Sequence, residues 1–318
     1  MVFCFLTTGR REFGLLVIVQ IPCLDEEATI AEVVRGVPRE LAGADRVEVL
    51  VVDDGSRDRS REAAIEAGAD HVVSFAGNRG LARAFAAGVD AALKLGADVI
   101  VNIDADGQYR PDQIPLLVAP ILSGAADVVV GDRGIKADPD YPRLKKALQV
   151  AGARTVRLLS GAEIKDATSG FRAFSREAAL RLHLVSDFTY TLESLIQAGK
   201  DRLRVTSVKV EARPVNRPSR LFSSIPEYLK KSAATLLRIY SMFEPLKVFS
   251  ILGGVIFSAG FLIGLWFVYY YLTEGGKGHV QLLILAAVLL IIGFQVLVMG
   301  LLADLIGANR KLIGDLLF

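Results

Sequence analysis

Residues Val99-Ile-Val-Asn-Ile-Asp-Ala-Asp-Gly-Gln108 combine an apolar run with two carboxylates placed one residue apart. A continuous apolar run bounded by turn residues is typical of a buried strand, which we predict over 97–103. In open α/β sheets ligands bind at the carboxyl ends of strands, where Asp104 and Asp106 fall. With Gln108 they supply the oxygen ligands that Mg²⁺ and Mn²⁺ prefer. The alternative is a solvated acidic turn.

Strands and helices alternate on both sides of this stretch. Apolar runs predict strands over 15–21, 47–52, 71–75 and 127–130, with helices over about 57–67, 81–95 and 112–122. A further helix is expected to open with Asp25 as its N-cap and to end near Pro38. The alternation predicts an α/β protein with a doubly wound, mostly parallel sheet.

The pattern changes beyond Gly131. A basic segment over 139–157 is predicted to form a helix near the site, and further helices should follow up to Gly199. Residues 203–212 alternate like an edge or antiparallel strand, and 213–220 read as a polar loop. The amphipathic stretch over 221–243 suits either a membrane-interface helix or an ordinary docking helix.

Two apolar runs, 248–272 and 281–306, close the chain. Both exceed the roughly 20 residues that are needed to cross a bilayer. Lys and Arg residues flank the pair of runs, whereas the only Asp, Glu, Lys or Arg residues of the connecting loop are Glu274 and Lys277. The positive-inside rule therefore predicts a multi-pass protein of the cytoplasmic membrane, with both termini in the cytoplasm and a short external hairpin.

These features divide the chain into three parts. We expect a cytoplasmic domain over 1–220, juxtamembrane helices over 221–245 and a transmembrane hairpin over 246–318. The apolar N-terminus is followed, not preceded, by Arg10 and Arg11, which does not match a signal peptide. The oligomeric state is open, although pairs of spans often pack with further helices, so a homo-oligomer is one option.

The composition excludes several classes of function. The 37 basic and 35 acidic residues nearly balance, so no surface for nucleic acid is implied. The two cysteines argue against a disulfide framework. The three histidines show no metal or triad spacing, and no Gly-x-Gly-x-x-Gly or Walker-type loop is present.

Other polar motifs are ambiguous when each is taken alone. Asp53-Asp54-Gly55-Ser56 at a predicted strand end suits either nucleotide recognition or a helix-capping turn. Arg133, Arg143 and Arg172 are either phosphate ligands or ordinary surface charges, and their concentration after the acidic motif favours phosphate. Asp166 is either catalytic or a residue that orients Arg172.

Five motifs occur in a characteristic order: Ile21-Pro-Cys-Leu-Asp-Glu-Glu27, Val51-Val-Asp-Asp-Gly-Ser56, Asp104-Ala-Asp-Gly-Gln108, Gly131-Asp-Arg133 and Asp166-Ala-Thr-Ser-Gly-Phe-Arg172. Over roughly 17–221 this set resembles the family 2 glycosyltransferases with the GT-A fold. Within them it is most similar to the branch of dolichol-phosphate-mannose synthases and polyprenyl-phosphate glycosyltransferases. The two C-terminal spans resemble those of bacterial members.

The resemblance implies a GT-A catalytic domain and a role for each motif. The nucleotide would be held by Pro22, Leu24, Glu26, Asp53, Asp54 and Asp104. The divalent metal, Mg²⁺ or Mn²⁺, would be held by Asp104, Asp106 and Gln108. The lipid phosphate would be gripped by Arg133 and Arg143, with Arg172, Arg213 and Arg220 as further candidates. Asp106, Asp166 and Arg133 would be the catalytic residues.

The chain departs from the family pattern at three points. The usual Gly-Ser-Arg is Gly131-Asp132-Arg133, which adds a negative charge near the proposed phosphate site. The later Arg-x-x-Gly-x-Ser-Lys block is matched only loosely by 213–220. Ala147 stands where family members often carry a polar residue.

The expected function is the inverting transfer of a sugar from a nucleotide-diphosphate donor to polyprenyl phosphate at the cytoplasmic face of the lipid bilayer. A processive polysaccharide synthase is one rival. Such enzymes carry a Gln-x-x-Arg-Trp motif, but the single Trp of this sequence, Trp266, lies within a predicted membrane span. A non-catalytic, membrane-anchored scaffold that binds nucleotide sugar or lipid is the other rival. The sequence does not separate UDP from GDP or one sugar from another.

Overall fold

The computed structural model describes residues 14–134, 164, 166–182, 184, 190–213, 238, 241, 244–275 and 279–316. The chain divides into two units, Met1–Pro218 and Ser219–Phe318. The predicted helix over 139–157 and nearly all of the amphipathic stretch over 221–243 lie outside the described residues. Arg143, Ala147 and Arg220 are among them.

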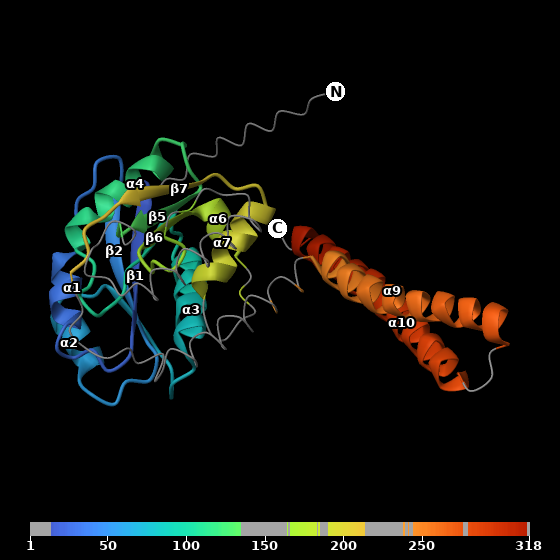
Figure 1. Cartoon of the computed structure of the whole chain (residues 1–318). Helices are drawn as coiled ribbons and strands as arrows, with labels where there is room; N and C mark the ends of the chain where they lie inside the picture. The colour runs from blue at the N-terminus through green and yellow to red at the C-terminus, as the bar shows by residue number, and fades with distance from the viewer. Residues whose placement is uncertain are drawn as a thin grey trace, which may run out of the picture. The chain divides into compact units, whose positions relative to one another are not determined.

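The first unit is built on a seven-stranded sheet in the order β3-β2-β1-β4-β6-β5-β7 (Figure 1). Its strands are β1 Leu16–Cys23, β2 Arg46–Asp53, β3 His71–Ser74, β4 Val99–Asn102, β5 Val128–Asp132, β6 Arg172–Ser175 and β7 Val205–Lys209. Strands β1 to β4 pair in parallel, and β7 pairs in parallel with β5. The prediction of an α/β, mostly parallel sheet is confirmed.

Strand β6 was not predicted. It runs antiparallel between β4 and β5, so that Asn102 lies opposite Arg172. The strand is only four residues long and begins with a charged side chain, so no apolar run marks it. The edge position predicted for 203–212 is confirmed for β7, whose pairing with β5 is parallel.

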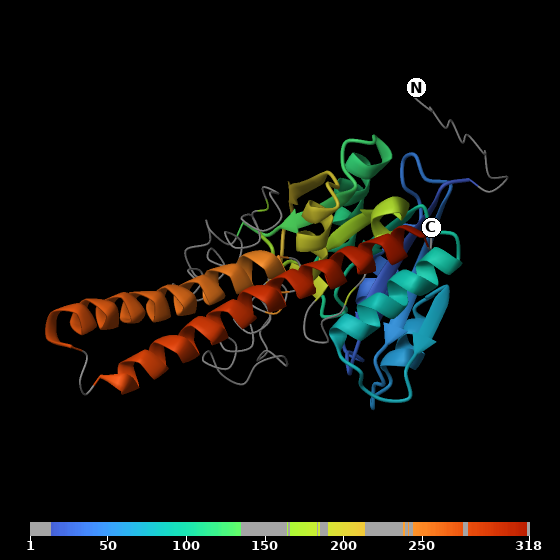
Figure 2. The same cartoon turned by 90° about the vertical axis from the view of Figure 1, so that its right-hand side faces the viewer.

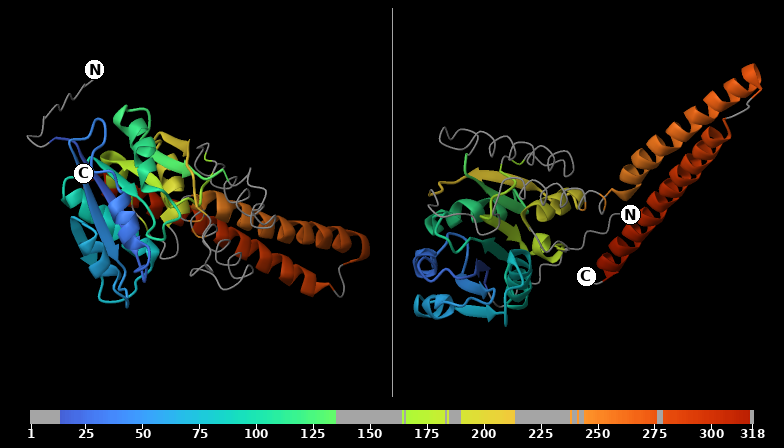
Figure 3. Two further views of the ribbon diagram at one scale, coloured as in Figure 1. Left: turned by 90° about the vertical axis from the view of Figure 1, so that its left-hand side faces the viewer. Right: turned by 60° about the horizontal axis from the view of Figure 1, so that its bottom comes forward.

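Helices cover both faces of the sheet (Figures 1 and 3). They are α1 Ile30–Gly36, α2 Ser60–Glu66, α3 Leu81–Lys94, α4 Ile114–Leu122 after a 3₁₀ turn at Pro111–Gln113, α6 Arg176–Leu180 and α7 Tyr190–Lys200. Helices α1, α2 and α4 pack on the face that carries Val17, Val19 and Ile21 of β1. Helices α3, α6 and α7 lie on the other face, where the small residues of α3 allow a close approach to β1 and β2.

The predicted N-cap at Asp25 is wrong. Helix α1 begins only at Ile30, and Asp25 has a positive φ of 51°. Its backbone N–H donates to Ser56 Oγ at 3.0 Å and its carboxylate accepts from the Arg57 N–H at 2.7 Å. The loop after β1 is thereby tied to the loop after β2, which places both loops at the same edge of the sheet.

The second unit contains two long helices, α9 Pro245–Glu274 and α10 Val280–Leu316, which form a hairpin (Figure 2). In length and composition, both helices are sufficient to cross a membrane. Gly293 lies directly against the backbone of Phe257, and Gly260 against Ala286 and Leu290. Such close backbone approach through small residues is a common way for membrane helices to associate.

We predict that Gly88→Ala destabilises the first unit by about 1–3 kcal/mol, the usual cost of overpacking a core. A Cβ at Gly88 would lie 2.9 Å from Val52 Cγ2 and even closer to Gln20 Oε1. Thermal unfolding of the purified protein measures the effect. Gly254→Ala is the control, because no described atom outside its own helix backbone lies within 4 Å of its Cβ position. A higher melting temperature for Gly88→Ala would contradict the packing.

Candidate functional site

The acidic loop Asp104–Gln108 follows β4 and is fixed on several sides. Thr29 Oγ1 donates to the Ala105 carbonyl at 2.7 Å, and the Gln108 N–H donates to Asp106 Oδ1 at 3.0 Å. The Gln108 carbonyl accepts the Arg213 N–H at 2.8 Å. Contacts from distant parts of the chain therefore hold the loop at the carboxyl end of β4, as predicted.

Asp104 sits closest to the protein interior. Its carboxylate lies against the Cα of Gly170, where a Cβ would be 2.8 Å from Asp104 Oδ1. Burial, and then the charge of Asp106, raise the pKa of Asp104 to about 7 against the opposing charges of Arg133 and Arg172. A cation beside these two carboxylates would stabilise their ionised forms.

The donor set fits a divalent ion that shares its coordination with a ligand. Among the described residues no group of three or more His, Cys, Asp and Glu side chains forms a complete metal cage. Asp104, Asp106 and the amide of Gln108 instead offer a partial set of hard oxygen donors. Mg²⁺ is usually bound in this way, through one or two carboxylates together with substrate phosphates and water.

The second part of the site is a bidentate pair between Arg133, just after β5, and Asp166. Arg133 Nε donates to Asp166 Oδ2 at 2.7 Å, and Nη2 donates to Oδ1 at 3.1 Å and to Thr168 Oγ1 at 2.9 Å. Only 14% of the Arg133 side chain and 4% of the Asp166 side chain are exposed. Burial raises the pKa of Asp166, but Arg133 and Thr168 outweigh it and hold that pKa below its ordinary value. The carboxylate is therefore ionised and orients Arg133.

Arg172 is not available to a phosphate, contrary to the sequence-based expectation. Its side chain is fully buried. The guanidinium donates to the carbonyls of Ser169, Ala167 and Thr191 and to Ser194 Oγ at 2.6–2.8 Å. Its role is to hold the turn before β6 against the start of α7. The alternative in which Asp166 orients Arg172 is also wrong, because Asp166 pairs with Arg133.

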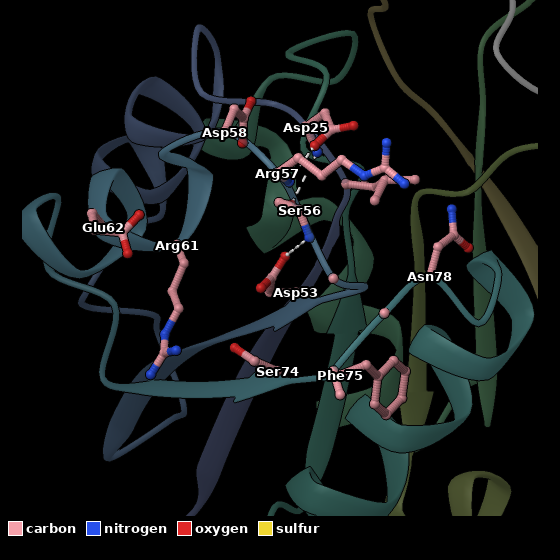
Figure 4. A pocket seen from close by; sticks show the side chains of 14 residues that line it. Asp25, Asp53, Ser56, Arg57, Asp58, Arg61, Glu62, Ser74, Phe75 and Asn78 are labelled. Carbon is pink, nitrogen blue, oxygen red and sulfur yellow. Dashed lines mark hydrogen bonds between the residues drawn. The ribbon is translucent and has the colours of Figure 1, made fainter.

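A cavity of about 580 Å³ lies beside the ends of β1, β2 and β3 (Figure 4). Its lining includes Leu24, Asp53, Arg57 and Phe75. Asp53 is held in place by the Ser56 N–H, which donates to Asp53 Oδ1 at 2.9 Å. The polar and aromatic lining suits a nucleoside, as predicted from the motifs at these strand ends.

Four of the six residues predicted to bind the nucleotide do not line this cavity: Pro22, Glu26, Asp54 and Asp104. Asp54 is buried, and its two carboxylate oxygens accept the N–H groups of Arg79 and Gly80 at 2.7 and 2.9 Å. It therefore shapes the turn before α3 and does not line the cavity. Pro22 lies within β1 and is likewise absent from the lining. Glu26 Oε2 and the Ala105 carbonyl both accept from Thr29 Oγ1, at 3.4 and 2.7 Å, so Glu26 lies beside the acidic loop.

Of the candidate arginines near the end of the first unit, only Arg213 is described. Its Nη1 is 2.8 Å from Glu32 Oε1 in an ion pair with largely exposed side chains. The Tyr109–Ala212 bridge and the Arg213 N–H join this segment to the acidic loop. Arg213 thus lies beside the acidic loop, on the side of α1.

Sequence reasoning missed several residues that contact the predicted site residues and hold them in place. Thr168 binds Arg133, Tyr109 contacts Ser169, and Gly170 backs Asp104. Thr168 and Gly170 belong to one of the five motifs, but no spacing rule pairs Thr168 with Arg133, 35 residues earlier, or Gly170 with Asp104, 66 residues earlier.

Comparison with known proteins agrees with this geometry. The family model "Glycosyl transferase family 2" matches residues 18–182, which contain the acidic loop and the Arg133–Asp166 pair. The chain belongs to this glycosyltransferase family. The model "GtrB C-terminal hairpin" matches residues 244–308, which hold the two apolar helices. This glycosyltransferase thus combines a GT-A catalytic domain with a membrane-type hairpin.

Similar proteins include enzymes named for lipid phosphates. The undecaprenyl-phosphate 4-deoxy-4-formamido-L-arabinose transferase of Pseudomonas aeruginosa is 31% identical, over 92% of this chain and 85% of its own length. The UDP-N-acetylglucosamine–dolichyl-phosphate N-acetylglucosaminyltransferase of Methanococcus voltae is 30% identical, over 62% and 85%.

A solved structure supports the fold. Glucosyl-3-phosphoglycerate synthase from Mycobacterium tuberculosis, in complex with Mn²⁺, UDP-glucose and glycerol 3-phosphate, is 26% identical. The match has a TM-score of 0.55 and covers 71% of this chain and 79% of that one.

We predict that Asp166→Asn lowers transferase turnover roughly 10- to 100-fold, because the charge-assisted anchoring of Arg133 is lost. Initial rates and thermal unfolding are measured together. Asp127→Asn is a matched control, since Asp127 makes a similar bidentate pair with Arg204 at the opposite end of β5. Equal losses of turnover in the two variants would contradict the assignment.

Proposed function

We propose that this glycosyltransferase moves a sugar, with inversion, from a nucleotide-diphosphate donor to polyprenyl phosphate at the cytoplasmic face of a membrane. The observation that carries the proposal is that one turn, 166–171, contacts both Asp104 and the Arg133 guanidinium. A site for a metal–diphosphate and a site for a second phosphate would then lie next to each other. The names of the similar proteins support the same acceptor.

In this proposal each group has a distinct task. The cavity lined by Asp53 and Phe75 would hold the nucleoside. Asp104, Asp106 and Gln108 would bind the diphosphate through the metal. A divalent ion held there would neutralise the charge of the leaving diphosphate. Arg133, fixed by Asp166, aims an acceptor phosphate oxygen at the anomeric carbon. That oxygen is already ionised at neutral pH, so the chain needs no strong general base.

The hairpin and its flanking charges support the membrane side of the proposal. A polyprenyl chain is apolar and stays in the bilayer, so its phosphate must be met at the interface. Helices α9 and α10 would anchor the catalytic domain there, with the cytoplasmic side indicated by the flanking Lys and Arg residues. The membership of the glycosyltransferase family argues against the alternative of a non-catalytic scaffold.

We predict that Asp106→Ala abolishes turnover while the protein stays folded, because one of the two carboxylates for the metal is removed. Product formation and thermal unfolding are the readouts. Asp112→Ala is the control, since this exposed carboxylate pairs only with Arg110 in the described contacts. Near-normal activity of Asp106→Ala would rule out the metal assignment.

A donor screen tests the reaction as a whole. Full-length protein in detergent is incubated with undecaprenyl phosphate, Mg²⁺ or Mn²⁺, and common UDP- and GDP-sugars. We expect a lipid-linked monosaccharide from one donor, its loss with a chelator, and an anomeric configuration opposite to that of the donor. Failure of every donor would contradict the proposed acceptor, and a retained configuration would overturn the inverting mechanism.

A further inference from the structure

A chain of hydrogen-bonded polar side chains, Gln20, Asn102 and Tyr190, lies buried next to the acidic loop. Gln20 Nε2 donates to Asn102 Oδ1 at 2.9 Å, between β1 and β4. Asn102 Nδ2 donates to the Gly170 carbonyl at 2.8 Å and to Tyr190 Oη at 2.9 Å. Gln20 and Asn102 are fully buried, and Tyr190 is 1% exposed.

The side chain of Asn102 is used to its full donor capacity. Both hydrogens of its amide donate and its oxygen accepts, so no polar group of this residue is left unpaired. Tyr190 is held in turn by stacking on Phe85, with ring centroids 3.9 Å apart and planes within 8°. The Gly170 carbonyl is therefore held by Asn102, whose own position is fixed by Gln20 and Tyr190.

Gly170 contacts Asn102 through its carbonyl and Asp104 through its Cα. The Asp104 carboxylate lies against the Gly170 Cα, closely enough that a Cβ would displace it. Asn102 thus acts on Asp104 by two routes: as its neighbour two residues earlier in the chain, and through the peptide of Gly170. A shift of that peptide would move the wall on which the carboxylate rests.

Packing alone does not explain a polar residue at this position. The other residues of β4 are Val99, Ile100 and Val101, and an apolar residue at 102 would bury as well. Buried amides cost free energy unless every group is paired, and this network leaves Gln20 Oε1 without a hydrogen bond among the described residues. Asn102 does, however, make a hydrogen bond to the Gly170 carbonyl that an apolar side chain could not make.

We propose that Asn102, supported by Gln20 and Tyr190, is a positioning residue that sets the Asp104 carboxylate for the divalent ion of the donor complex. It does so by donating a hydrogen bond to the Gly170 carbonyl, which fixes the peptide against which Asp104 lies. The inference rests on the proposed metal-dependent function and adds to it a residue that touches neither substrate nor metal.

The test measures Mn²⁺ affinity without turnover. Full-length protein is titrated with Mn²⁺ in the presence of UDP, and free Mn²⁺ is followed by electron paramagnetic resonance well below the melting temperature. We expect Asn102→Ala to weaken binding about tenfold, as documented for residues that support metal ligands. Gly170→Ala should weaken it similarly, because it shifts Asp104 directly.

Two further variants separate positioning from stability. Ile100→Val removes buried volume from the same strand, so it should lower the melting temperature while Mn²⁺ affinity stays unchanged. Tyr190→Phe keeps the stacked ring and removes only the hydroxyl. It should weaken Mn²⁺ binding two- to threefold even where Asn102→Ala fails to fold.

The outcomes distinguish this inference from the function on which it rests. If Asp104→Ala loses Mn²⁺ but Asn102→Ala or a folded Tyr190→Phe binds it like the wild type, the positioning role is wrong and the metal site stands. If the wild type binds no more Mn²⁺ than Asp104→Ala, both proposals are wrong. If Ile100→Val weakens binding as much as Asn102→Ala, the effect is one of stability and the positioning role is again wrong.

Discussion

The buried guanidinium of Arg172 holds the turn on which the candidate site depends. Its hydrogen bonds to three carbonyls and to Ser194 fix residues 167–171 between β6 and α7. A guanidinium taken out of water is costly unless its donors are satisfied, so the surrounding carbonyls have little freedom to move. From this turn Gly170 contacts Asp104 and Thr168 contacts Arg133, so the acidic and basic parts of the site share one support.

The antiparallel strand β6 makes this arrangement possible. Parallel strands deliver the loops after β1, β2 and β4 to one edge of the sheet. Because β6 runs the other way, the segment before it arrives at that edge, opposite Asn102. The turn can therefore meet the acidic loop at the end of β4 and the Arg133 side chain at the end of β5. A sheet with only parallel strands would place that segment at the opposite edge.

Opposite charges in the site are kept in separate but neighbouring positions. Asp166 pairs with the guanidinium of Arg133. Burial, and then the charge of Asp106, raise the pKa of Asp104. Without that pairing, Arg133 would be drawn to the carboxylates of the acidic loop by the same Coulomb attraction. In the proposed function, Asp166 thus allows carboxylates that would bind a cation and a guanidinium that would bind a phosphate to lie close together. Such a division suits a glycosyltransferase that must bring two phosphorylated substrates together.

The sequence by itself determined the α/β class, most strand positions and the two apolar helices, because each follows from a local period of apolar residues. It also located the acidic loop and Asp53, which sit where strands end. Only the tertiary structure decided which charges meet. Asp166 pairs with Arg133, whereas Arg172 and Asp54 form hydrogen bonds with backbone groups. None of these pairings produces a local pattern in the sequence. The short β6, with Arg172 buried at its start, has no local pattern for the same reason: it is buried between β4 and β5, which lie far earlier in the chain.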